Sequence, residues 1–110
     1  MAYGVRMEAD EAVLTVFGRA DRSNPTLLAL MRVTVSRFAQ ERKGRWVVDL
    51  SDAPSMTRDG LLPILLVLGG AAAADVRPIL RDPPPDVLAL LWSVGLHKIA
   101  HIEIDGKLVT

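Results

Sequence analysis

The chain has 110 residues, of which half are apolar, so it can bury the core of one compact domain, and we expect a single domain over residues 1–110. It contains no cysteine, which excludes disulfides, thiolate metal sites and cysteine nucleophiles. Its 13 basic and 13 acidic side chains cancel, and the basic residues are scattered along the chain, so the composition argues against binding to nucleic acid.

Nothing in the sequence predicts a membrane segment. The longest uncharged run, from Gly60 to Ala74, is shorter than the roughly 20 residues that a membrane-spanning helix needs, and Pro63 interrupts it. The N-terminus has no basic region followed by an apolar stretch, so no signal peptide is expected. Together with the absence of cysteine, these features predict a cytoplasmic protein without direct membrane insertion.

Hydrophobic periodicity, proline and glycine divide the chain into strands and helices. Strands are predicted at 5–9, 12–17, 46–50, 76–80 and 99–104, and helices at 25–43, from about 57 to 73 and at 87–94. The first helix is expected to begin at Pro25, after Ser23 and Asn24, which can cap it. Gly44 and Gly95 are expected to end the first and third helices in a left-handed conformation. The first two strands are expected to turn at Asp10 and Glu11.

The order of these elements predicts the fold class. The continuous apolar run at 46–50 is typical of a central strand that is buried on both faces. Pro78 lacks the donor that a sheet ladder needs, which places the strand at 76–80 toward an edge. Because crossovers between parallel strands are right-handed, the helices should pack over the sheet. We therefore expect an α/β fold with a mixed sheet of about five strands, three or four covering helices and an N-terminal β-hairpin.

Three stretches of the chain follow the patterns of one protein family. They are a strand ending in Gly18-x-x-Asp21, a strand ending in Asp49-Leu50-Ser51 and followed by Asp59-Gly60-Leu61, and a helix closing with Gly95-Leu96. In this order and spacing they resemble the STAS family of bacterial anti-sigma factor antagonists. The resemblance implies a STAS-like fold and a non-enzymatic role in transcription signalling. It also implies a protein partner, either an anti-sigma factor of the serine-kinase type or a STAS-containing assembly.

The chain departs from this family at the residue that would carry its switch. Aligned on Gly60 and Leu61, Arg58 lies where the resemblance implies a serine that a partner kinase phosphorylates, and Thr57 lies where it implies an aspartate. Arginine cannot accept a phosphate, so the usual switch is absent. Arg58 either contacts an acidic or phosphorylated group of the partner or is an exposed arginine that was tolerated after the switch was lost.

The residues around Arg58 complete a predicted partner-binding loop. Ser55 and Thr57 are suited to helix capping, and they would be phosphorylation sites if the switch were displaced. Asp59 offsets the unfavourable position of an arginine at the positive end of a helix dipole, and Gly60 follows it. Asp21 matches the family's acid beside the same surface, or it is a turn residue after its strand.

The second predicted helix is unusual because no charged residue occurs from Gly60 to Ala74, although a helix packed on a sheet normally has a polar outer side. One side carries Leu61, Leu65 and Leu68, and another carries Leu62, Leu66 and Gly69. A monomer of this size cannot bury both sides equally. We expect the outer side, with Leu62 and Leu66, to bind a partner or a second copy, unless neighbouring loops cover it.

No pattern in the chain predicts an enzyme, a metal site or a cofactor. The end of a helix and the start of a strand separate His97 from His101, so the two are not expected to share a metal. The carboxylates between residues 49 and 59 lack a catalytic partner, and Gly69-Gly70 lacks the lysine of a phosphate-binding loop. The resemblance leaves two alternatives open, an accessory subunit of a membrane transporter ATPase complex and a nucleotide-binding STAS domain.

Overall fold

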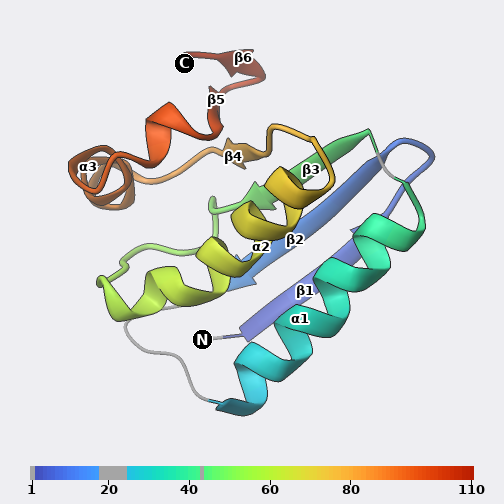
Figure 1. The fold of residues 1–110 in the computed structure, drawn as a ribbon. Helices are drawn as coiled ribbons and strands as arrows, with labels where there is room; N and C mark the ends of the chain where they lie inside the picture. The colour runs from blue at the N-terminus through green and yellow to red at the C-terminus, as the bar shows by residue number, and fades with distance from the viewer. Residues whose placement is uncertain (1, 18–24, 43) are drawn as a thin grey trace.

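The computed structural model describes residues 2–17, 25–42 and 44–110 (Figure 1). The strands are β1 (Ala2–Met7), β2 (Glu11–Phe17), β3 (Arg45–Asp49), β4 (Ile79–Arg81), β5 (His101–Ile104) and β6 (Lys107–Leu108). The helices are α1 (Pro25–Gln40), α2 (Leu62–Ala73) and α3 (Pro85–Ser93), and the 3-10 turns are η1 (Asp59–Leu61) and η2 (Leu96–Lys98). Each predicted strand and helix is therefore present, with bounds shifted by a few residues.

The strands form one mixed sheet in the order β1-β2-β3-β4-β5-β6. Strands β2 to β5 are parallel neighbours, whereas β1 and β6 pair antiparallel at the two edges. The predicted α/β fold with an N-terminal hairpin is confirmed. The sixth strand is an addition to the prediction. It forms because Asp105 and Gly106 adopt positive φ angles of 51° and 79°, which reverse the chain in a hairpin turn.

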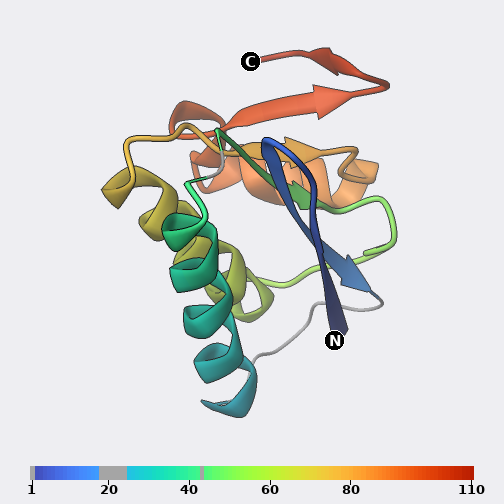
Figure 2. The same ribbon diagram turned by 90° about the vertical axis from the view of Figure 1, so that its right-hand side faces the viewer.

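The sequential order of the strands explains why the helices cover one face. Right-handed crossovers between strands that are added in one direction all return over the same side of the sheet. The main core accordingly joins that face to all three helices, and its fully buried members include Trp46 and Ile102 from the strands, Phe38 from α1, Val67 from α2 and Leu91 from α3. Figure 2 shows α1 and α2 together on one side of the β1–β2 hairpin.

The prediction that Pro78 places its strand at an edge is wrong. β4 lies between β3 and β5 in the interior of the sheet. Pro78 precedes the first strand residue, Ile79, and its carbonyl oxygen accepts a hydrogen bond from the His101 N–H at 2.8 Å. The proline thus supplies an acceptor from outside the strand, where its missing donor does not interrupt the pairing.

Gly44 does not have the expected role of helix terminator. The left-handed residue after α1 is Arg42, with a φ of 51°. The Gly44 N–H instead donates to Asp10 Oδ1 at 3.0 Å, and a Cβ atom on Gly44 would lie 2.6 Å from that oxygen, so glycine is needed for close approach. Glu11, expected in the turn with Asp10, is already the first residue of β2. Gly95, with a φ of 81°, follows α3 as expected.

Charged side chains cover the face of the sheet opposite the described helices. Val13, Val47 and Ile79 are neighbours on β2, β3 and β4, and they form an apolar row that is buried on this face. Two glutamates and two arginines surround the row in a closed cycle of ion pairs, here called the charge ring: Glu11–Arg45 at 3.8 Å, Arg45–Glu103 at 3.5 Å, Glu103–Arg81 at 2.8 Å and Arg81–Glu11 at 3.2 Å.

The strand register shows how the charge ring buries the row beneath it. Glu11 precedes the row on β2 and Arg81 follows it on β4, so their ion pair crosses over Val47 on β3. The pair Arg45–Glu103 crosses in the same way over β4. The aliphatic stems of these side chains therefore cover the apolar row, while the charged groups neutralise one another.

Candidate protein-binding site

The chain leaves β3 through a tight turn made by Asp49 and Ser51. Asp49 Oδ1 accepts hydrogen bonds from the Ser51 N–H at 3.0 Å and from the Ser51 hydroxyl at 2.7 Å. Leu50 between them is fully buried, and its N–H donates to the Arg81 carbonyl oxygen at 2.9 Å. The turn anchors the loop that runs from the carboxyl edge of the parallel strands to the start of α2.

Asp49→Ala is expected to lower the free energy of unfolding by about 1 kcal/mol, because it removes both hydrogen bonds of this turn. Ser51→Ala removes one of the two bonds and should cost less. Urea denaturation followed by circular dichroism measures both changes. An unaltered midpoint for Asp49→Ala would show that the turn does not anchor the loop.

Arg58 lies immediately before η1, which leads directly into α2. Gly60 N donates to Thr57 O and Leu61 N donates to Arg58 O, both at 3.1 Å. The Arg58 backbone already has helical angles, with a φ of −58° and a ψ of −38°. The side chains of Arg58 and Asp59 are exposed, whereas Gly60 is buried. The arginine therefore stands at a helix start and faces solvent.

The two hydroxyl residues of the loop differ in exposure. Ser55 is half-buried and Thr57 is exposed. The N-cap positions of η1 and α2 belong to Arg58 and Leu61, and neither side chain makes a capping hydrogen bond. Asp21 falls outside the described residues, so its place beside this loop stays a prediction.

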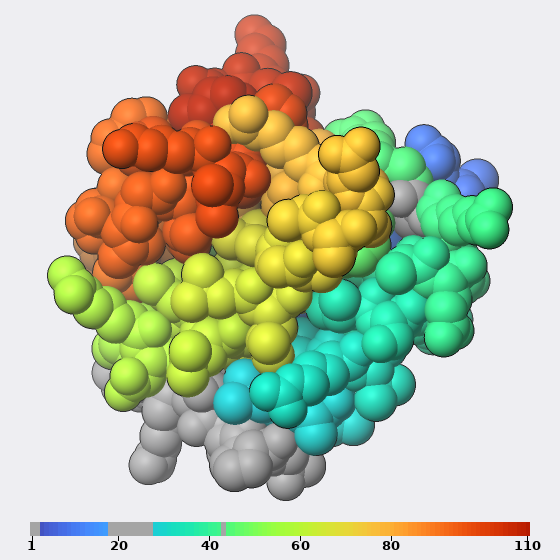
Figure 3. Space-filling model, in the orientation of Figure 1, coloured from blue at the N-terminus to red at the C-terminus, as the bar shows by residue number. Residues whose placement is uncertain are grey.

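The outer side of α2 is apolar and exposed. Leu62 and Leu65 are 45% and 42% exposed, and Gly69 and Ala72 also face solvent. In the space-filling view of Figure 3 this helix, coloured yellow-green, lies uncovered at the front of the molecule. The exposed apolar side of the second helix is therefore present, and we call Leu62, Leu65, Gly69 and Ala72 the α2 stripe.

The predicted division of the α2 leucines needs correction. Leu65 was grouped with the buried Leu68, but it is exposed, and Leu66, predicted to bind a partner, is half-buried against the core. The buried side of α2 consists of Pro63, Ile64, Val67, Leu68 and Ala71. Leu65 follows Ile64 by 100° around the helix, which places it outside that side.

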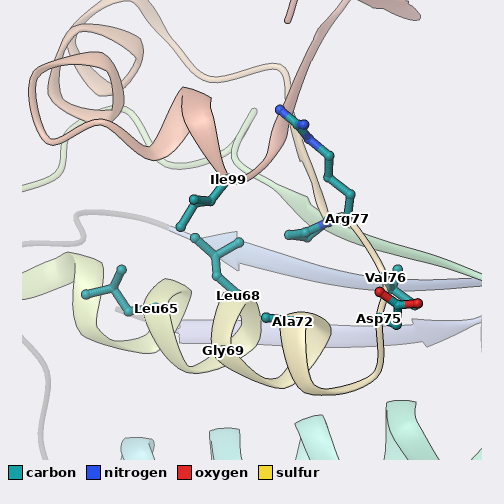
Figure 4. A pocket seen from close by; sticks show the side chains of 9 residues that line it. Leu65, Leu68, Gly69, Ala72, Asp75, Val76, Arg77 and Ile99 are labelled. Atoms are coloured by element: carbon teal, nitrogen blue, oxygen red, sulfur yellow. The ribbon is translucent and has the colours of Figure 1, made fainter.

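A hollow of about 690 Å³ opens beside the α2 stripe (Figure 4). Its walls are mainly apolar and include Leu65, Leu68 and Ile99, which converge in Figure 4 from α2 and from the chain after η2. Asp75 and Arg77 line the hollow near the C-terminal end of α2. The hollow therefore extends the exposed apolar surface from α2 toward η2.

Two residues of this surface are missing from the predicted site. The uncharged run from Gly60 to Ala74 predicts an exposed apolar side of the helix, but the sequence places Leu62 and Leu66 on it and Leu65 on the other side. Ile99 was expected to begin the last strand. That strand begins at His101, and Ile99 follows η2 with 54% of its surface exposed. A short 3-10 turn has no reliable sequence pattern, so nothing in the sequence separated Ile99 from the strand.

The two histidines make separate contacts. The His97 ring stacks on Trp92 with 3.9 Å between ring centroids, and His101 Nδ1 lies 2.8 Å from the Thr110 carbonyl oxygen. Among the residues described, no group of three or more His, Cys, Asp or Glu side chains could hold a metal ion. Across the same part of the chain, no helix combines the length and hydrophobicity that crossing a membrane requires.

No family model matches the sequence, and no curated protein matches it. Solved structures do match the fold. The anti-sigma factor antagonist SpoIIAA of Bacillus, in its unphosphorylated form, gives a TM-score of 0.67 at 18% identity and covers 96% of this chain and 90% of that chain. Its phosphorylated form gives a TM-score of 0.67 at 19% identity over 92% and 90% of the two chains. TM1081 of Thermotoga maritima, classed as an anti-sigma factor antagonist, gives 0.69 at 18% identity over 92% and 85%.

These matches compare whole folds and not one motif, because each covers more than nine-tenths of this chain. Their identities lie below 20%, so the likeness concerns the arrangement of the backbone. The protein has the STAS fold of the anti-sigma factor antagonists.

Proposed function

We propose that this chain is a non-enzymatic regulatory domain that binds a partner protein in the manner of an anti-sigma factor antagonist. In this proposal residues 1–110 act as one domain in the bacterial cytoplasm. The binding surface consists of the loop before α2, with Ser55, Thr57, Arg58, Asp59 and Gly60, and of the α2 stripe that follows it.

The observation that supports this proposal most directly is the continuity of two exposed surfaces at the start of α2. Arg58, just before η1, and Asp59, its first residue, face solvent, and Leu62 and Leu65 face solvent within the next two turns. Exposed leucines beside a charged rim are typical of protein interfaces. The surface offers apolar contact and few groups that could carry out acid–base or nucleophilic chemistry.

The charge at position 58 indicates the kind of partner surface. The fold neighbour SpoIIAA is known in a phosphorylated and an unphosphorylated form. A phosphate adds about −1.5 to −2 charges to a contact surface, whereas Arg58 carries a permanent positive charge. We infer that Arg58 faces a carboxylate of the partner, which its planar guanidinium can bind through two hydrogen bonds. In this proposal, phosphorylation at position 58 cannot switch binding off, because arginine does not accept a phosphate.

Arg58→Glu is expected to weaken the complex at least about tenfold, because it places an acid against the partner's carboxylate. The matched control is Arg32→Glu, which reverses an exposed arginine on α1 and should leave the affinity unchanged. The partner is first isolated from the native cell with the tagged chain and identified by mass spectrometry. Titration calorimetry then measures both variants against it.

Two results test the regulatory role. They are the identity of the partner and the phosphorylation of a variant that carries a hydroxyl at position 58. An ATP-binding protein of the serine-kinase type supports the proposal, and Arg58→Ser should then gain a phosphate when incubated with that partner and ATP, as intact mass would show. A transport ATPase as the isolated partner would overturn the proposed role in favour of a transporter subunit. Equal losses of affinity for Arg58→Glu and Arg32→Glu would show that Arg58 is not part of the binding surface.

A further inference from the structure

The chain contains two Asp-Gly pairs, Asp59–Gly60 and Asp105–Gly106. In this dipeptide the backbone nitrogen of the glycine can attack the side-chain carboxyl carbon of the aspartate, because glycine has no Cβ atom to hinder the approach. The two pairs are chemically alike. A difference in their reactivity within the folded protein therefore comes from the structure around each pair.

The structure protects the pair Asp59–Gly60. Both residues belong to η1, and the Gly60 N–H donates to the Thr57 carbonyl oxygen at 3.1 Å. Gly60 is also buried, and η1 continues directly into α2. The nitrogen is therefore engaged in a helical turn, and that turn would have to open before the nitrogen could reach the Asp59 carboxyl carbon.

The pair Asp105–Gly106 has both reacting groups free. The two residues are exposed and form the turn between β5 and β6. Within the described ranges, no residue pairs with the Asp105 carboxylate, and none accepts a hydrogen bond from the Gly106 N–H. A Cβ atom on Gly106 would meet nothing within 4 Å, so the space around the nitrogen is open.

The turn is anchored on one side only. The Asp105 N–H donates to Asp82 Oδ1 at 2.9 Å, whereas β6, on the other side, consists of two exposed residues at the edge of the sheet. A short edge strand opens at low free-energy cost. Opening lets the Asp105 backbone leave its left-handed conformation, with a φ of 51°, and bring the Gly106 nitrogen to the carboxyl carbon.

We propose that Asp105 is a site of spontaneous isomerisation to isoaspartate. The Gly106 nitrogen loses its proton and bonds to Asp105 Cγ, and a carboxyl oxygen leaves as water, which closes a succinimide ring. Water then adds to the main-chain carbonyl carbon of Asp105 and breaks its bond to the Gly106 nitrogen. The chain now runs through Cγ, and the former main-chain carbonyl carbon becomes a free carboxylate. Solvent supplies the water, and no other reactant is needed.

Isomerisation lengthens the backbone of the turn by one carbon atom. The turn closes in two residues because Asp105 and Gly106 have φ angles of 51° and 79°, and isoaspartate cannot keep this geometry. The segment beyond the turn covers the outer edge of β5, where the Val109 N–H donates to the Ile102 carbonyl oxygen at 2.7 Å and the Ile102 N–H donates to Thr110 Oγ1 at 2.9 Å (Figure 1). We expect both bonds to be lost, which leaves β5 as an open sheet edge.

Incubation of the folded chain at physiological temperature and pH, followed by tryptic peptide mapping, tests the site. Peptide 99–107 carries Asp105, and peptide 59–81 carries Asp59. Isoaspartate, detected by methyl transfer from S-adenosylmethionine with protein isoaspartate methyltransferase, should accumulate at least about tenfold faster in peptide 99–107. In concentrated urea the two peptides should react at similar rates. Equal rates in the folded chain, or a difference that persists in urea, would overturn the proposal.

The variants Asp105→Asn and Asp59→Asn form a faster, matched version of this test. Asparagine closes the same succinimide with loss of ammonia, and hydrolysis of the ring then changes the intact mass. Asparagine also adopts the left-handed conformation as readily as aspartate, so Asp105→Asn keeps the turn. In the folded state Asp105→Asn should deamidate at least about tenfold faster than Asp59→Asn. A faster reaction of Asp59→Asn would contradict the protection of Gly60.

Hydrogen exchange tests the structural consequence. The isoaspartate form is separated from the parent chain by chromatography, and exchange is followed at the Ile102 amide. This amide should exchange faster in the isoaspartate form, whereas the Val48 amide, in the interior strand β3, should exchange as in the parent. An Ile102 amide that stays protected would show that β6 remains in place. Neither experiment needs the regulatory partner, so failure here leaves the proposed function to its own test.

Discussion

Gly70→Ala is expected to lower the free energy of unfolding by about 1–3 kcal/mol, whereas Gly69→Ala, one residue earlier in α2, should raise it by about 1 kcal/mol. Alanine is a better helix former than glycine, so both changes gain in helix propensity. The difference comes from the surroundings of the two residues. Gly69 faces open space, and Gly70 faces α1.

The contact at Gly70 leaves no room for a methyl group. A Cβ atom there would lie 2.1 Å from Val35 Cγ1 and 3.3 Å from Trp46 Cζ3. Val35 is β-branched and sits within α1, where valine has one strongly preferred rotamer, so it cannot turn away cheaply. Trp46 is fully buried in the core and cannot move outward. Accommodating alanine therefore forces α1 and α2 apart along their shared contact.

Urea denaturation of the two single variants measures these changes, and Val35→Ala completes the experiment. In the double variant G70A/V35A the new methyl group occupies the space left by the valine. Its loss should be clearly smaller than the sum of the two single losses. Additive losses would show that the Gly70–Val35 contact is not the cause, and a stabilised Gly70→Ala would show that the two helices are farther apart than in this structure.

The two adjacent glycines illustrate what the sequence can and cannot predict. The sequence predicted the second helix to about Ala73, where α2 does end. Because residues 60–74 carry no charge, the helix has no polar side, and its hydrophobic pattern cannot show which side faces the sheet. The exposure of Leu65 and the close contact of Gly70 depend on how α1 and α2 pack, which only the structure shows.

Errors elsewhere have similar causes. Local rules identified Pro78 and Gly44 correctly as structural signals but assigned the wrong reason to each. Pro78 lies one residue before its strand, so the rule for proline within a strand does not apply. Glycine is required at position 44 because the backbone there lies close to Asp10, 34 positions away, and no local pattern reveals that contact. The position of Arg58 near a helix start, by contrast, follows from short spacings within one local motif. The sequence could therefore predict it.

The charge ring could not be predicted from the sequence. Glu11, Arg45, Arg81 and Glu103 lie on four different strands, and none is near another along the chain. They meet because the register of β2 to β5 brings their side chains to one face. The ring replaces a second layer of helices over the apolar row, and its contribution to stability follows from how deeply each charge is buried.

Glu103→Gln is expected to lower the free energy of unfolding by about 1–3 kcal/mol, the range for losing a charged hydrogen bond in a largely buried setting. The Glu103 side chain is 10% exposed and that of Arg81 is 19% exposed, and their 2.8 Å hydrogen bond is the shortest contact of the ring. Arg45→Met is the matched control. The Arg45 side chain is 47% exposed and its ion pairs are longer, so its loss should cost at most about 1 kcal/mol.

The state of Arg81 fixes the pH range in which this contribution exists. Burial acts to lower the pKa of Arg81, but its hydrogen bond to Glu103 and the charges of Glu103 and Glu11 outweigh burial and raise that pKa above its ordinary value. A group whose pKa is raised in the folded state stabilises the fold at every pH below its ordinary pKa, and this stabilisation is lost only in strong alkali. Urea midpoints for Glu103→Gln and Arg45→Met should therefore keep their difference between neutral pH and pH 9. Equal losses from the two variants would mean that the charge ring is a set of solvated surface pairs, and the burial of the apolar row would then need another cause.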